Sequence, residues 1–175
     1  PPYGVSYVGK TAESLEIKND GASDLAPLLR GVFAKCFSLL KLGGFIYVAH
    51  PAGRNSLVFG NEIVAAGFNY REGIVWDKGT IALGHSDYHY SHEPIIYANK
   101  PGPGRVGRGG TGWYGDNAQK SVLAYPKPSA SKDHPTTKPI ELVEHCLRNS
   151  CKVGGLVFEP FSGSGTTLLA CERLS

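Results

Sequence analysis

Apolar residues recur every three or four positions in two early stretches of the chain. The first stretch, DLAPLLRGVFAKCFSLLKLGG, covers residues 24–44 and predicts an amphipathic helix that ends at Gly43 and Gly44. The second predicts another helix near residues 57–66. Between them, FIYVAH (residues 45–50) is a short apolar and aromatic run, which predicts a buried strand.

Two further strands are predicted by REGIVWDK (residues 71–78) and HEPIIYANK (residues 92–100). Residues 101–135 follow with many glycines, prolines and charges and little periodicity, so we interpret them as an irregular insertion.

Regular patterning returns in HPTTKPIELVEHCLRNSCKVGG. Thr136 or Thr137 can cap a helix whose first turn holds Pro139 and Glu141. The next stretch, LVFEPFSGSGTTLLACERL, is typical of a strand, a glycine-rich turn and a helix. Strands that alternate with helices predict a largely parallel α/β sheet with ligands at the carboxyl ends of its strands.

The length of 175 residues, 41% of them hydrophobic, suits one globular domain over residues 1–175. No apolar run approaches the ~20 residues that span a bilayer, and no secretory signal is present, so we expect a soluble intracellular protein. The four cysteines form no CxxC pair, which predicts reduced thiols and neither disulfides nor a zinc site.

Positive charge is concentrated in and beside the insertion. Residues 100–138 contain seven basic and two acidic side chains, a local net of +5, whereas the whole chain has a net charge of +3. Together with Trp113, Tyr114 and Tyr125, this composition suits contact with a phosphate backbone. From charge alone, a solvated loop is the favoured interpretation, and a phosphate-contact surface is the alternative.

The stretch FSGSGTT, residues 161–167, carries a chemical signal that is weak when taken alone. Glycines between a strand and a helix let a ligand approach the backbone and the free N–H groups of the helix start. A P-loop would need lysine where Thr166 stands, and a dinucleotide fingerprint would need a third glycine where Leu168 stands. The motif alone leaves open both a structural turn and a site for a nucleoside-type cofactor.

HSDYHYSHE, residues 85–93, is a candidate metal site through His85, Asp87, His89 and His92. Its spacing does not match the helical HExxH arrangement, and its alternation favours a loop that leads into a strand. We therefore predict no metal site, and a metal-dependent hydrolase is the weakest of the functional hypotheses.

Three stretches together resemble one family: PPYG at residues 1–4, the HPTTKPIELVEHC segment, and EPFSGSGTTLLACERL. They are similar to the amino-group DNA methyltransferases of the beta arrangement, in which the catalytic motif precedes the cofactor motif. The stretches LLKLGGFIYV, GIVWDKG and HEPIIYANK also resemble that family, so the likeness covers nearly the whole chain.

The resemblance implies a Rossmann-like S-adenosylmethionine-dependent methyltransferase fold in circularly permuted order. It also implies that the chain is an incomplete fragment. The polar residue that precedes PPY in the family is absent, and so is the strand whose acid would hold the cofactor ribose. We expect such a fragment to be weak or inactive by itself.

The implied activity is methyl transfer from S-adenosylmethionine to the exocyclic amine of a flipped DNA base, with adenine N6 preferred over cytosine N4. The implied catalytic residues are Pro1, Pro2 and Tyr3, where the carbonyl of Pro1 accepts the amine hydrogens and Tyr3 stacks on the base. The implied cofactor-binding residues are Thr136, Thr137, Lys138, Pro139, Glu141, Glu159, Phe161, Gly163, Gly165 and Thr166. Glu159 stands where the family usually has aspartate.

The insertion occupies the place of the family's target-recognition region, so double-stranded DNA is the implied partner. The candidate DNA-binding residues are Arg105, Arg108, Trp113, Tyr114, Lys120 and Lys127. The resemblance also implies a bacterial or phage enzyme of the cytoplasm and allows a cognate restriction endonuclease. The alternative from another class is a nucleic-acid-binding module that kept the fold and lost catalysis.

Overall fold

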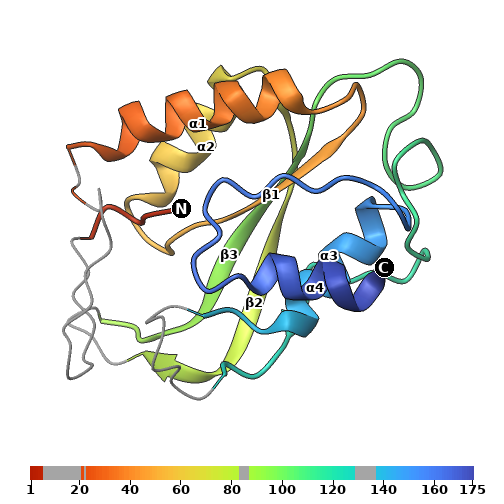
Figure 1. The fold of residues 1–175 in the computed structure, drawn as a ribbon. Coiled ribbons are helices and arrows are strands. Elements are labelled where there is room, and N and C mark those ends of the chain that lie inside the picture. The colour runs from red at the N-terminus through yellow and green to blue at the C-terminus, as the bar shows by residue number, and fades with distance from the viewer. Residues whose placement is uncertain (6–20, 22, 83–86, 129–136) are drawn as a thin grey trace.

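Four helices and four strands make up the ordered framework of the computed structural model, which describes residues 1–5, 21, 23–82, 87–128 and 137–175 (Figure 1). In chain order the elements are α1 (Leu25–Leu39), β1 (Phe45–Ala49), α2 (Ser56–Ala65), β2 (Asn69–Ala82), β3 (Tyr90–Asn99), β4 (Val122–Ala124), α3 (Ile140–Ser150) and α4 (Thr166–Leu174).

The four strands form one sheet in the order β1-β3-β2-β4. Strand β3 is antiparallel to both of its neighbours, and β4 is parallel to β2. The expectation of a largely parallel sheet is therefore wrong for this sheet. The reason is local: β2 and β3 are joined as a hairpin, and a connection so short can only reverse the chain.

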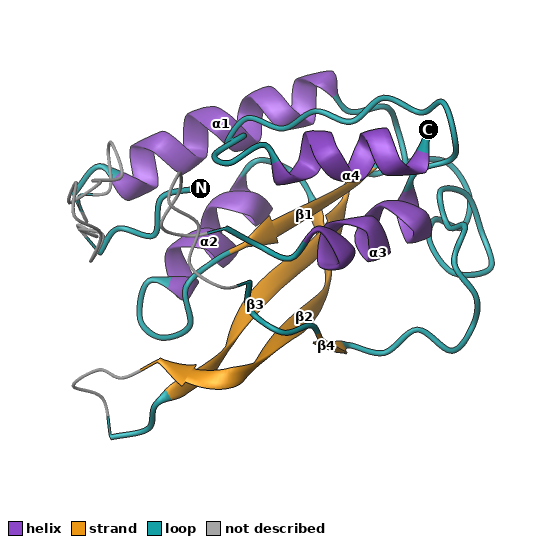
Figure 2. Cartoon of the chain, turned by 60° about the horizontal axis from the view of Figure 1, so that its bottom comes forward, coloured by secondary structure: helices purple, strands orange, loops and turns teal. Residues whose placement is uncertain are grey.

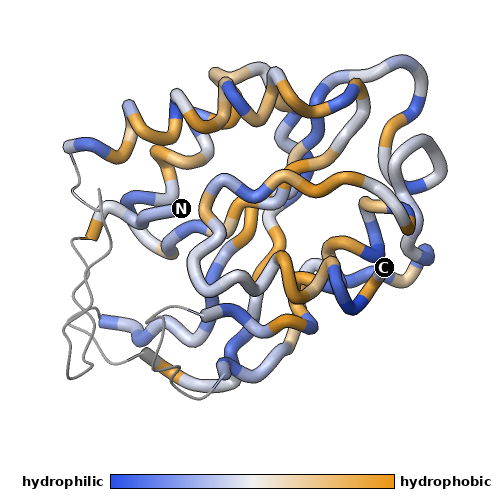
Figure 3. Tube along the Cα trace, in the orientation of Figure 1, coloured by the Kyte–Doolittle hydropathy of each residue, from blue (hydrophilic) through white to orange (hydrophobic). Residues whose placement is uncertain are grey.

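Alternating residues of the strands face two separate apolar cores, one on each side of the sheet. On one side Val48, Ile96 and Ala98 pack with α1 and α2. On the other side Trp76 and Ile95 pack with Leu123 of β4 and Leu142 of α3. Helices thus cover both faces of the sheet, as Figure 2 shows from a second direction. Figure 3 shows apolar positions recurring along α1 and through the strands.

Over its described residues, 101–128, the insertion is irregular apart from one short strand that the sequence did not predict. Strand β4 pairs with Val75–Asp77 of β2, and the indole nitrogen of Trp76 donates a hydrogen bond of 2.7 Å to the carbonyl of Tyr125. These contacts bring the last part of the insertion back along β2, toward the end of the sheet where β2 leads into β3.

Two predictions for the last third of the chain are wrong. The helix expected after Thr136 or Thr137 has Pro139 at its N-cap. Pro139 itself has extended backbone geometry, with a φ of −59° and a ψ of 136°, so the helix begins only at Ile140. The segment LVFE forms no strand, and Leu156, Val157 and Phe158 are exposed by 102%, 40% and 53%. A strand needs a hydrogen-bonding neighbour, and none of the described residues pairs with this segment.

Within the described ranges, none of the helices has both the length and the apolar character that crossing a membrane requires.

The burial of α1 predicts a clear contrast between two of its leucines. Leu29 is fully buried, whereas Leu39 of the same helix is 54% exposed. We expect Leu29→Ala to lower the free energy of unfolding by about 2–5 kcal/mol, because it removes buried methyl groups and leaves a cavity. Leu39→Ala should change it by about 0.5 kcal/mol or less. Urea denaturation of both variants measures this, and equal losses would contradict the assignment of the core.

Candidate active site

Hydrogen bonds to its backbone carbonyls hold the PPYG turn in place. The side-chain amide of Asn55 donates hydrogen bonds to the carbonyls of Tyr3 and Gly4, at 2.9 and 3.1 Å. Gly4 has a φ of +69°, and a Cβ there would lie 2.9 Å from the Cδ2 atom of Leu25. Because any side chain would be both strained and crowded there, this turn requires glycine.

The side chain of Tyr3 lies against Phe59 of α2 and reaches Glu93 of β3. The ring meets Phe59 edge-on at 6.3 Å, and the hydroxyl donates a hydrogen bond of 2.7 Å to the Oε2 atom of Glu93. Burial, and then the negative charge of Glu93 and this hydrogen bond, raise the pKa of Tyr3 well above its ordinary value. Tyr3 is therefore a protonated donor at physiological pH.

Two lysines surround the same carboxylate. The Nζ atom of Lys78 lies 3.4 Å from one oxygen of Glu93, and the Nζ atom of Lys138 lies 3.9 Å from the other. Burial alone would raise the pKa of Glu93, but the charges of Lys138 and Lys78 and the hydrogen bonds from Tyr3 and Lys78 outweigh it. The pKa of Glu93 consequently lies below its ordinary value, and the carboxylate is ionised.

The glycine-rich turn is organised by Glu159. Its carboxylate accepts a hydrogen bond of 2.8 Å from the backbone N–H of Phe161 and one of 3.0 Å from the hydroxyl of Thr167. Gly165, with a φ of 76°, is the N-cap of α4. A Cβ at Gly165 would meet no atom within 4 Å, so space is open beside this helix start. Figures 1 and 2 both place the turn next to the amino-terminal PPYG segment.

The other residues predicted to bind cofactor are dispersed. Lys138 points toward the PPYG turn, where its Nζ atom lies 3.4 Å from the Tyr3 hydroxyl and 5.8 Å from the centre of the ring. Glu141 is exposed and pairs with Arg173 of α4 at 3.6 Å. Thr137 is half-buried just before Lys138, and Thr136 lies outside the described residues.

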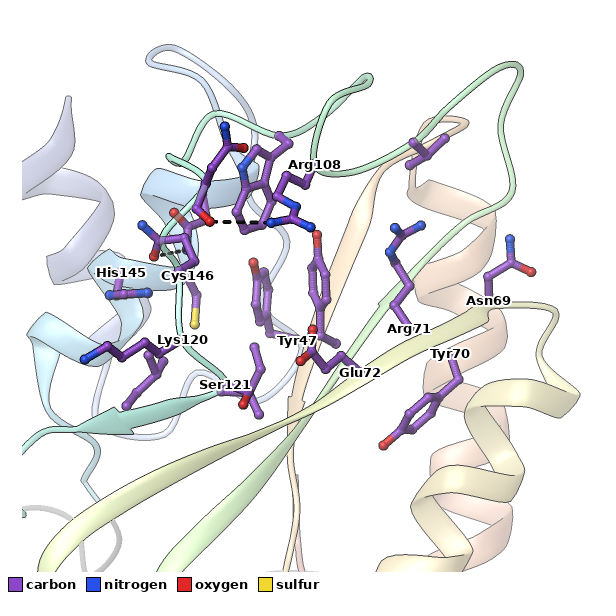
Figure 4. Close-up of a pocket in the computed structure, with 18 of the residues that line it drawn as sticks. Tyr47, Asn69, Tyr70, Arg71, Glu72, Arg108, Lys120, Ser121, His145 and Cys146 are labelled. Atoms are coloured by element: carbon purple, nitrogen blue, oxygen red, sulfur yellow. Dashed lines mark hydrogen bonds between the residues drawn. The ribbon is translucent and has the colours of Figure 1, made fainter.

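The first part of the insertion borders a cavity of about 670 Å³ at the other end of the sheet (Figure 4). The cavity also contacts the beginning of β2, from Asn69 to Ile74. Seven residues separate Arg71 from Lys78, which is about 23 Å along a strand. Four of the predicted DNA-binding residues line this cavity: Arg105, Arg108, Trp113 and Lys120.

Several of these insertion side chains also hold the insertion together. Arg105 donates a hydrogen bond to the carbonyl of Arg108, and Arg108 donates one to the carbonyl of Asn117. Trp113 packs edge-on against Tyr97, whereas the side chain of Tyr114 is 49% exposed.

Lys127 differs from the rest of the predicted DNA-binding set. It is exposed, and its backbone N–H donates to the carbonyl of Lys78. It therefore lies at the same end of the sheet as Tyr3.

In the part of the chain that the structure describes, no three histidine, cysteine, aspartate or glutamate side chains come together as a metal site. Of the HSDYHYSHE candidates, His85 lies outside the described residues. Asp87 and His89 are exposed, and His92 packs edge-on against Tyr90.

Sequence reasoning missed Asn55, Lys78 and Glu93 as site residues. Each lies near the carboxyl end of β1 or β2, or at the start of the antiparallel strand β3 beside them. The signal was available, because a charged or amide side chain at such a position is where an α/β fold places its ligand-binding groups.

The low pKa of Glu93 predicts a dependence of stability on pH. A carboxyl whose pKa is lowered by folding stabilises the protein above its unfolded pKa of about 4.3, and this contribution is lost as the pH falls through the folded pKa. We expect the unfolding free energy to fall more steeply from pH 6 to pH 3 in the wild type than in Glu93→Gln. Chemical denaturation across that range measures it, and parallel profiles would contradict the ion cluster with Lys78 and Lys138.

Comparison with solved structures supports the fold. The complex of M1.HpyAVI with SAM superimposes with a TM-score of 0.65 at 23% identity, over 84% of this chain and 72% of that chain. TTHA0409, a DNA modification methylase of Thermus thermophilus by its description, was solved in complex with S-adenosyl-L-methionine and gives a TM-score of 0.62 at 23% identity, over 89% and 70%. The fold is thus the Rossmann-like fold of DNA methylases.

Sequence comparison supports the family. The type II methyltransferase M2.MboI of Moraxella bovis is 28% identical over an alignment of 195 positions, gaps included, which covers 97% of this chain and 68% of that protein. The model of the N6/N4 DNA methylase family, described as DNA methylase, matches residues 1–175. This chain therefore belongs to the N6/N4 DNA methylase family.

Proposed function

We propose that this DNA methylase transfers the methyl group of S-adenosylmethionine to the exocyclic amine of a flipped DNA base, with adenine N6 preferred to cytosine N4. The observation that carries the proposal is convergence at one end of the sheet. The PPYG turn, fixed by Asn55 and Glu93, lies next to a glycine-rich turn that opens into the start of α4.

The glycine-rich turn fits a cofactor of this kind. Gly163 and Gly165 both have positive φ, and Gly165 leaves open space beside the first N–H groups of α4. Phe161, Gly163, Gly165 and Thr166 would line the cofactor, and Glu159 shapes the turn from within. When bound, S-adenosylmethionine supplies an electrophilic methyl group on a sulfonium.

The amino-terminal turn fits the base. An exocyclic amine is a poor nucleophile because its lone pair is delocalised into the ring, so the enzyme must orient that lone pair. In the proposal the carbonyl of Pro1 accepts an amine hydrogen and the ring of Tyr3 stacks on the base. The base must first leave the duplex to reach this turn.

The insertion supplies the surface for the duplex in this proposal. Lys127 lies at the end of the sheet where Tyr3 lies, and Arg105, Arg108 and Lys120 continue the positive charge to the other end. The distance of about 23 Å along β2 is close to seven base-pair steps of 3.4 Å, so one duplex can contact both ends. Because the relative from Moraxella bovis is a type II methyltransferase, a cognate restriction endonuclease is part of the proposal.

The activity is tested by the chemistry of the product. We expect the protein expressed from its complete gene, incubated with unmethylated DNA and S-adenosylmethionine, to yield N6-methyladenine when the DNA is digested to nucleosides and analysed by mass spectrometry. A product of N4-methylcytosine would agree with the proposed mechanism but would show that the target base is cytosine. If a folded protein that binds DNA gives no methylated nucleoside, the chain is a binding module and the proposal fails.

The role of the insertion in DNA binding is tested by the dependence of the binding constant on salt concentration. Each phosphate contact contributes a slope of about −0.9 to the dependence of log K on log salt, so Arg105→Ala with Arg108→Ala should flatten the slope by about 1.8. Lys35→Ala with Lys41→Ala removes the same charge from exposed positions on and just after α1 and should leave the slope unchanged. Fluorescence anisotropy titrations of a labelled duplex at several salt concentrations measure both. An unchanged slope for the arginine variant would contradict the assignment of Arg105 and Arg108 as phosphate contacts.

A further inference from the structure

A buried carboxylate, Glu93 of the HEPIIYANK stretch, contacts the amino-terminal turn, and no role was predicted for it from the sequence. The side chain of Glu93 is only 13% exposed, and its oxygens contact Tyr3, Lys78 and Lys138. These groups come from four separate places in the chain: the amino-terminal turn, β2, β3 and the segment before α3. We call Glu93, Lys78 and Lys138 the carboxylate cluster.

The free-energy cost of burying Glu93 indicates that the carboxylate cluster serves a function. Removing a carboxylate from water costs several kcal/mol unless opposite charges and hydrogen bonds compensate. Here the two lysines and the tyrosine hydroxyl supply that compensation. An apolar residue at position 93 would fill the same place without this need, but it would remove the carboxylate that accepts the hydrogen bond from the Tyr3 hydroxyl.

The contacts restrain Tyr3 at both ends. Asn55 fixes the carbonyls of Tyr3 and Gly4, Phe59 meets the ring edge-on, and Glu93 holds the hydroxyl at the far tip of the ring. With the backbone, the ring and the hydroxyl each in contact, the side chain has little freedom to rotate. A stacking platform that is already oriented loses less entropy when a base arrives.

We infer that Glu93 is a positioning residue that, together with Lys78 and Lys138, fixes the ring of Tyr3 for stacking on the flipped base. The inference rests on the proposed function and assigns to Lys138 a contact with the base-stacking tyrosine rather than with the cofactor. Glu93 acts through Tyr3 and does not itself touch the reacting atoms.

The test uses the protein from its complete gene and a duplex that contains its methylated sequence. We expect Glu93→Gln to lower kcat by about 10- to 100-fold, because a misplaced group of this kind costs up to about 100-fold. The KM for S-adenosylmethionine should stay within about twofold. With 2-aminopurine at the target position, the fluorescence that reports the flipped base should fall in the same variant.

A matched control and a double variant make the test specific. Glu172→Gln makes the same chemical change at an exposed position near the end of α4 and should leave both readouts unchanged. Tyr3→Phe removes only the hydroxyl, so combining it with Glu93→Gln should lower kcat no further than the more severe single variant. If Glu93→Gln fails to fold, Lys78→Gln takes its place, since it removes one of the two compensating charges.

The outcomes distinguish failure of the positioning role of Glu93 from failure of the proposed function. An active wild type whose Glu93→Gln variant keeps kcat and fluorescence overturns the positioning role, as does a double variant in which the two losses multiply. A wild type that methylates no base overturns the proposed function, whereas the fluorescence of a 2-aminopurine duplex still reports whether Glu93 affects base flipping.

Discussion

The ionised carboxylate of Glu93 is the interaction on which the arrangement of the site depends. It is stable in a buried position only because Lys78 and Lys138 compensate its charge. That requirement brings together β2, β3 and the segment before α3, and the Tyr3 hydroxyl adds the amino-terminal turn. One electrostatic constraint thus connects the segment that leads into α3 with the turn proposed to hold the base.

The sheet provides the rigid support for this arrangement. Its two faces are buried by different helices, and alternate residues of β1 and β3 contribute to both cores. At the end of the sheet where β2 leads into β3, the chain places the PPYG turn, the carboxylate cluster and Lys127. At the other end it places the cavity and the arginines of the insertion. In the proposed function, methyl transfer therefore takes place at one end of the sheet, and the more distant contacts with DNA lie at the other end.

Local patterns in the sequence predicted most of the elements, because helices such as α1 and strands such as β1 depend on apolar periodicity that neighbouring residues carry themselves. The direction of β3 and the pairing of β4 depend on partners distant in sequence. The segment at Leu156 shows the same limit, since a strand-like pattern forms no strand without a neighbour. For the site, motif resemblance predicted roles for Tyr3 and Gly165. The contacts of Glu93 and Asn55 with Tyr3 emerged only from the fold, because they span 90 and 52 positions.

The central claim is that the flipped base lies against Tyr3. Photocrosslinking tests it most directly: a duplex with 5-iodouracil in place of the target base is irradiated in complex with the protein, and the attached peptide is identified by mass spectrometry. The account predicts attachment at Tyr3, with little attachment in the Tyr3→Ala variant. Attachment to Trp113 or Tyr114 at the other end of the sheet, with none at Tyr3, would contradict it.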